Sequence, residues 1–206
     1  LATNREVGRL FTRAYSYLAA AKIFLDEVKS YYRDTGALDV GALDKKVLEL
    51  THEIFEGHPR QTDNPKARHL FATAITPKGP ESKLETIVDD LDTRYIINGD
   101  DGTGKNTLVR RLMEAALMRG HHVEAYHCAL DPALIDHLVI PDLGVAVVNA
   151  VEPHFFRPQS SDIVVDTTEF VNAAINEKFL VEKKYAREMY RGSMEQAIWF
   201  IFQAKQ

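Results

Sequence analysis

A glycine-rich segment, Gly99-Asp-Asp-Gly-Thr-Gly-Lys-Asn-Thr107, narrows the possible folds of this chain more than any other feature. The apolar run before it, residues 94–97, has the composition of a buried strand. After it, apolar residues recur at helical spacing from about 105 to 119, and Gly120 follows them. In such a strand–loop–helix order, glycines let backbone N–H groups turn inward, and the helix N-terminus adds partial positive charge. The segment therefore predicts a phosphate-binding loop.

The spacing G-x-x-x-x-G-K of a P-loop is met by Gly99, Gly104 and Lys105. Lys105 is predicted to reach the β- and γ-phosphates of ATP or ADP and is the candidate catalytic residue. The predicted nucleotide-binding residues are Gly99, Gly102, Thr103, Gly104, Lys105, Asn106 and Thr107. The alternative is an ordinary glycine-rich turn that is followed by a surface lysine.

The two expected magnesium positions both carry asparagine. Asn106 stands where a P-loop has a serine or threonine hydroxyl, and Asn149 ends the apolar strand where an aspartate is expected. These two residues are the candidate Mg²⁺ ligands, and we expect metal binding to be weak because Mg²⁺ demands near-ideal octahedral geometry. Glu152 is a possible substitute, with a solvated loop acid as the alternative.

Two loop acids oppose phosphate binding. Asp100 or Asp101, about 6 Å from a phosphate at an effective dielectric near 20, would cost up to about 3 kcal/mol, and salt would reduce that value. Asp101 also has counterparts in P-loops that resemble those of thymidylate kinases, so we expect the loop to tolerate it.

Strands alternate with helices after residue 69, and this order predicts an α/β fold. We expect a P-loop NTPase-type three-layer domain over 69–206, with a mainly parallel sheet, and a helical hairpin or linker over 1–57. The predicted helices are 4–29, 42–56, 105–119 and 168–203, with a further helix after the capping box Ser82-x-x-Glu85 and a short helix or turn at 131–138. The predicted strands are 69–75, 94–97, 123–128 and 144–150.

Charge and composition exclude several classes of function. The 206-residue chain has a net charge of −5 and no basic block, which argues against a nucleic-acid partner. No apolar run approaches the length of a membrane span, so we expect no membrane partner. Cys128 is the only cysteine, which fits a reducing, cytoplasmic compartment. Because the chain begins at Leu1 rather than Met, we expect it to be a fragment of a longer protein.

Three segments, "HLFATAITPKGP", "RYIINGDDGTGKNTL" and "VEAYHCALDPALIDHLVIPDLGVAVVNAVEPH", resemble a little-characterised bacterial family of tandem P-loop ATPase-like proteins, some described as nucleotide-kinase-related. The resemblance implies that 69–206 is the second of two P-loop halves and that 1–57 is the helical stretch between them. It also implies a companion half as a partner and ATP hydrolysis. The chain departs from the family pattern at Asp101, Asn106, Asn149 and Glu152.

Other side chains are secondary candidates. His121, His122, His127 and Cys128 are either a transition-metal site or, as the spacing favours, packing residues at strand ends. His154 is a candidate phosphate contact, and Arg157, Arg187 and Arg191 are either phosphate-stabilising or salt-bridge arginines. Asp131 and Asp136 are interpreted as capping or surface acids, and Trp199 and Phe200 as packing residues against the helical hairpin.

Two functions remain open at this level. The first is an ATP- or ADP-binding P-loop NTPase or nucleotide-kinase-like enzyme whose turnover is slow because both metal positions are amides. The second is a degenerate regulatory or scaffold half that binds nucleotide weakly or not at all. A protein-interaction module built on the long helices is a third and less favoured alternative.

Overall fold

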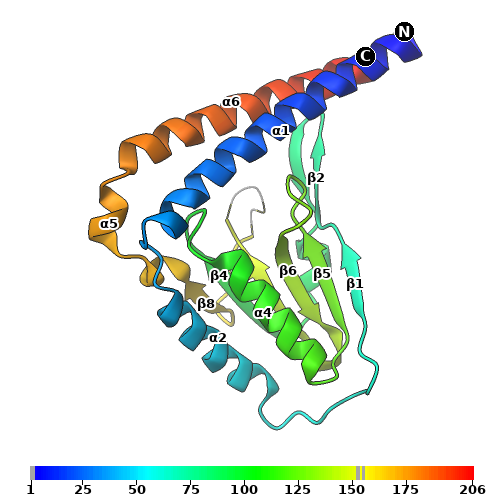
Figure 1. Cartoon of the computed structure of the whole chain (residues 1–206). Coiled ribbons are helices and arrows are strands. Elements are labelled where there is room, and N and C mark those ends of the chain that lie inside the picture. Colours follow the sequence, from blue (N-terminus) through cyan, green and yellow to red (C-terminus); the bar gives the residue numbers. More distant parts are fainter. Residues whose placement is uncertain (1–2, 152–153, 155) are drawn as a thin grey trace.

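The computed structural model describes residues 3–151, 154 and 156–206, and its centre is a six-stranded sheet (Figure 1). The strand order is β1-β5-β6-β7-β4-β8, and β6 alone runs against its neighbours, so the sheet is mostly parallel as predicted. The strands are β1 (Ala67–Leu70), β4 (Thr93–Asn98), β5 (Val123–His127), β6 (Ile135–Ile140), β7 (Val145–Asn149) and β8 (Ile163–Asp166).

Both faces of the sheet are covered, which explains why its inner strands are buried along most of their length. One face packs against α2 (Val40–Phe55) and α4 (Lys105–Met118), and Leu43, Leu108 and Leu112 share one core with the strands. The opposite face is covered by the single turn α3 (Glu85–Val88) and by the segments around Ala72 and Phe156. The sequence therefore folds as an α/β structure around a buried sheet.

The two N-terminal helices form as predicted but do not make a hairpin with each other. α1 (Asn4–Asp34) lies along α6 (Leu180–Lys205), and these two helices form a long arm that carries both termini at its far end (Figure 1). α2 instead packs on α4, because its apolar stripe fits the sheet's core. Phe200 stacks on Tyr17 of α1 at 5.6 Å between ring centroids, whereas Trp199 is half-exposed.

Three predicted elements were wrong in detail. The predicted strand 69–75 breaks at Phe71, and β2 (Thr73–Thr76) pairs with β3 (Gly79–Ser82) in a separate antiparallel hairpin. Of the predicted helix or turn at 131–138, residues 132–133 do form a turn, but 135–138 belong to β6, which is buried along its length.

The predicted helix 168–203 is interrupted. It begins as a 3₁₀ turn η2 (Thr167–Phe170), continues as α5 (Ala173–Glu177) and becomes continuous only in α6. The break has a local cause, because the Asn172 side chain accepts a hydrogen bond from the Ile175 backbone N–H and starts a new helix. Strand β8, just before η2, was not predicted. None of the described helices is long and apolar enough to cross a membrane.

Candidate functional site

The glycine segment forms the tight connection between β4 and α4. Gly99, Gly102 and Gly104 have φ angles of 131°, 93° and 97°, a region that side-chain-bearing residues rarely adopt. The chain therefore needs glycine at these three positions to turn from the strand into the helix.

Neighbouring elements hold this loop closely. The Thr103 hydroxyl donates to the carbonyl of Asp100 at 2.8 Å and lies 2.6 Å from the Thr167 hydroxyl. A Cβ at Gly102 would fall on the Tyr32 ring and 3.1 Å from the Lys29 Cα, so α1 rests directly on the loop. The arm formed by α1 and α6 therefore packs directly against the glycine loop through α1.

This contact makes Gly102→Ala a sharp test of the loop's packing. We expect a loss of about 2 kcal/mol or more in the free energy of unfolding, because the new methyl meets α1 and the positive φ strains alanine. Gly192→Ala, within α6, is the control: its Cβ meets nothing within 4 Å, and we expect a small gain. Urea denaturation of both variants gives the comparison, and equal stabilities would refute the packing described here.

Lys105 is buried within the loop that precedes it. Its side chain is 5 % exposed, and Nζ donates to the Gly99 carbonyl at 2.6 Å and to the Asp100 carbonyl at 2.5 Å. Burial lowers the pKa of this lysine, while Asp101, Asp100 and Asp136 act in the opposite direction. An ammonium group thus lies against two backbone carbonyls of the loop, at the N-terminus of α4.

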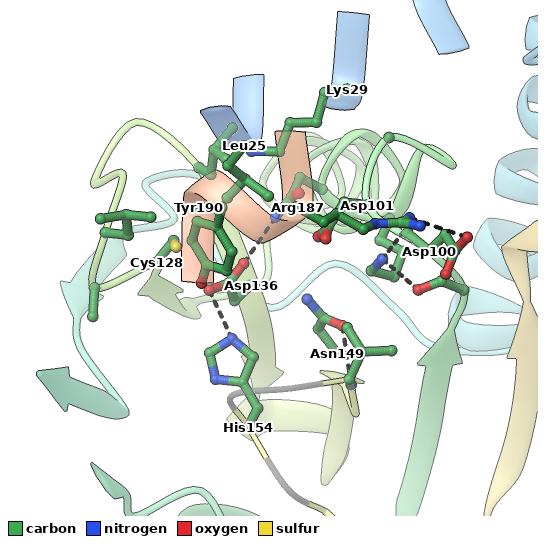
Figure 2. Close-up of a pocket in the computed structure, with 18 of the residues that line it drawn as sticks. Leu25, Lys29, Asp100, Asp101, Cys128, Asp136, Asn149, His154, Arg187 and Tyr190 are labelled. Carbon is green, nitrogen blue, oxygen red and sulfur yellow. Dashed lines mark hydrogen bonds and ion pairs between the residues drawn. The ribbon is translucent and has the colours of Figure 1, made fainter. Parts of the chain in front are cut away.

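A chain of polar side chains leads from the second residue of α4 to the β2–β3 hairpin. Asn106 Nδ2 donates to the Ile135 carbonyl at 3.0 Å and to Asp136 Oδ1 at 2.9 Å. His154 Nε2 lies 3.0 Å from Asp136 Oδ2, and its Nδ1 lies 2.9 Å from the Thr73 hydroxyl (Figure 2). The interpretation of Asp136 as a capping or surface acid was wrong, because β6 buries it to 4 % exposure.

The protonation state of each titratable side chain at this buried site is set by burial and by the groups beside it. Burial alone would raise the pKa of Asp136, but the hydrogen bond and charge of His154, the nearby His137 and the amide of Asn106 together lower it to about 2. Burial lowers the pKa of His137 to about 3, and burial raises that of Cys128 to about 11. At neutral pH the site therefore holds an aspartate, a neutral His137 and a protonated thiol.

A cavity of about 790 Å³ opens between the glycine loop, α1, α6 and the β2–β3 hairpin. Figure 2 shows Lys29 of α1 and Arg187 of α6 around it, together with Asp136 and His154. Of the predicted nucleotide-binding residues, Gly99, Gly102, Gly104, Lys105, Asn106 and Thr107 line the cavity, and the secondary candidates His154, Arg187 and Arg191 also line it. Thr103 is absent from the lining because its side chain turns toward Thr167. Arg157 is also absent from the residues that line the cavity.

The loop acids have different environments. Asp100 lies 3.2 Å from Arg187 Nη2 and accepts from the Tyr32 hydroxyl at 3.3 Å. These two partners reduce the repulsion that Asp100 would exert on a phosphate. Asp101 lines the cavity beside Lys105.

The predicted magnesium positions, Asn106 and Asn149, both line the cavity. Asn149 is 5 % exposed, and its Oδ1 accepts from the Val151 N–H at 3.4 Å. Glu152, the possible substitute acid, lies outside the described residues. Within the part of the chain that the structure describes, no group of three or more His, Cys, Asp or Glu side chains could hold a metal ion.

The histidines near Cys128 do not converge. His121 is buried against the Phe55 ring at 5.5 Å, whereas His127 Nε2 lies 2.7 Å from His69 Nδ1 on the outer part of the sheet. Cys128 itself faces the cavity. Packing, the alternative that the spacing favoured, describes this cluster better than a transition-metal site.

Sequence reasoning missed Asp136, Thr73, Thr167 and Tyr32 as parts of the site. Asp136 had one usable signal, the β-branched and apolar residues of "IDHLVI", which are typical of a strand, but Pro132 shortly before them favoured a turn. Comparisons of the chain with protein-family models, with curated protein sequences and with solved structures gave no match. Its function is therefore inferred from the geometry of the cavity.

Proposed function

We propose that the cavity binds ATP or ADP, with the phosphates in the loop Gly99–Thr107. The observation that carries this proposal is the buried Lys105, whose Nζ lies within a loop of three positive-φ glycines at a helix N-terminus. Backbone N–H groups and an ammonium group in this arrangement attract phosphate oxygens. A volume of about 790 Å³ also falls within the usual range for small-molecule sites.

Turnover is expected to be slow. Efficient phosphoryl transfer relies on a metal held beside the phosphates, and positions 106 and 149 offer amides in place of a hydroxyl and a carboxylate. We therefore propose a nucleotide-binding domain of P-loop type, in which hydrolysis or phosphoryl transfer is secondary to binding.

Calorimetric titration with ATP, ADP and adenosine tests this proposal. We expect saturable binding of ATP and ADP in the high micromolar range and no detectable binding of adenosine, because the phosphates supply most of the contacts. Equal affinities for adenosine and ADP would mean that the protein recognises the nucleoside rather than the phosphates. The absence of binding at millimolar nucleotide would reject the proposal.

The scaffold alternative has one observation in its favour. The arm formed by α1 and α6 exposes large apolar side chains, among them Tyr15, Ile23 and Trp199. Such exposure is typical of surfaces that contact another protein, including a companion half of a longer chain. If no nucleotide binds, this surface becomes the main candidate for function.

A further inference from the structure

The carboxylate beside Asn106 belongs to Asp136, and both of its oxygens have a nitrogen atom close by, although only Oδ1 accepts a hydrogen bond of normal geometry. Asp136 Oδ1 accepts from Asn106 at 2.9 Å, and Oδ2 lies 3.0 Å from His154 Nε2. Both partners are nitrogen donors on buried or half-buried side chains, and Asp136 itself is 4 % exposed. A cation that approached Asp136 would have to displace one of these donors.

The amide oxygens of Asn106 and Asn149 do not replace Asp136 as a charged metal ligand. Asn149 Oδ1 accepts from the backbone of Val151, and Asn106 offers only an uncharged amide oxygen. Mg²⁺ is usually bound through one or two carboxylates together with phosphates and waters. Asp136, the carboxylate that contacts Asn106, is buried and already lies against His154, so Asn106, Asp136 and Asn149 do not form a donor set that fits Mg²⁺.

Side-chain cations are available to balance phosphate charge instead. The cavity is lined by five of them, Lys29, Arg33, Lys105, Arg187 and Arg191, against four acids. Of these groups, Asp100 lies against Arg187 and Asp136 against His154, whereas Lys29 and Arg33 pair with Asp26 and Asp34 outside the cavity lining. Arg191 has no hydrogen-bond or ion-pair partner among the described residues, so it is free to contact an anion.

From this arrangement we infer that the site takes its nucleotide free of divalent metal. Lys105 and the α6 arginines supply the positive charge, and the Asn106–Asp136–His154 chain occupies the corner beside the phosphates. The inference rests on the proposed function, since it specifies the form of the nucleotide that the same loop binds. It differs from the usual P-loop arrangement, in which the metal contributes the largest local charge.

The test is calorimetric titration of ATP into the intact chain, once in excess EDTA and once in excess MgCl₂. We expect the two dissociation constants to agree within about threefold. Binding that is tighter by about tenfold or more with Mg²⁺ would overturn the inference while leaving the proposed function standing. No binding in either buffer would reject the proposed function, and the inference with it.

Variants make the test specific. Arg191→Ala is expected to weaken ATP binding by about fivefold in both buffers, whereas Arg157→Ala, outside the cavity, should leave it unchanged. The double variant Asn106→Ser with Asn149→Asp should create a dependence on Mg²⁺ that the natural chain lacks. If the natural chain instead shows that dependence and Asp136→Asn removes it, Asn106 and Asp136 act as a metal-holding pair and the inference is wrong.

Discussion

Replacing Lys105 with methionine is expected to weaken ADP and ATP binding by about 100-fold, equivalent to about 2.7 kcal/mol. Methionine keeps the apolar stem of the buried side chain and removes only the ammonium group. That group lies within hydrogen-bond distance of two loop carbonyls, where a phosphate would also come close. Charge-assisted contacts of this kind are the strongest single interactions in a phosphate site. Calorimetric titration measures the loss.

Lys45→Met on the exposed face of α2 is the control for this prediction, and it should bind nucleotide as the natural chain does. Thermal unfolding should show that Lys105→Met remains folded, because the substitution also removes the cost of burying a lysine whose pKa is lowered by burial. Unchanged nucleotide affinity in a folded Lys105→Met protein would mean that the loop is not the phosphate site.

Acidification is expected to destabilise the fold strongly through His137. Burial lowers its pKa to about 3 from an ordinary value of 6.5. The unfolded chain therefore takes up a proton near pH 6.5 that the folded protein accepts only near pH 3. Stability is full above pH 6.5 and falls by up to about 1.4 kcal/mol per pH unit as the pH drops toward 3, a total of about 5 kcal/mol. Burial lowers the pKa of His121 as well, which adds to the same trend.

Urea denaturation between pH 7 and 4 measures this dependence. His137→Gln, which removes the titrating group and keeps an acceptor for the Asn149 N–H, should lose less stability over that range than the natural protein. His52→Gln, at an exposed position on α2, should retain the natural slope. Identical slopes for His137→Gln and the natural protein would show that His137 is not buried as described.

The elements with strong periodicity were predictable from the sequence. α1, α2, α4 and the strands β4, β5 and β7 lie close to their predicted ranges because each carries a complete apolar face. The loop that joins β4 to α4 was also located correctly, since three glycines with positive φ leave a direct trace in the sequence.

What the sequence did not reveal depends on long-range pairing. α1 has an apolar stripe, but nothing in that stripe specifies whether α2 or α6 covers it. Asp136 was misinterpreted for a similar reason: its burial follows from β6 lying between β5 and β7, an arrangement that requires an antiparallel strand inside a mostly parallel sheet. The contact of Asp136 with Asn106 and His154 spans separate parts of the chain, so no local pattern indicates it.

A crystal structure of the protein with ADP tests the central proposal most directly. The account predicts phosphate density within the loop 99–107, within hydrogen-bond distance of its backbone N–H groups. It also predicts that Lys105 Nζ leaves the Gly99 carbonyl to contact that phosphate. ADP bound elsewhere, with the loop empty and Lys105 still on the Gly99 carbonyl, would contradict the account.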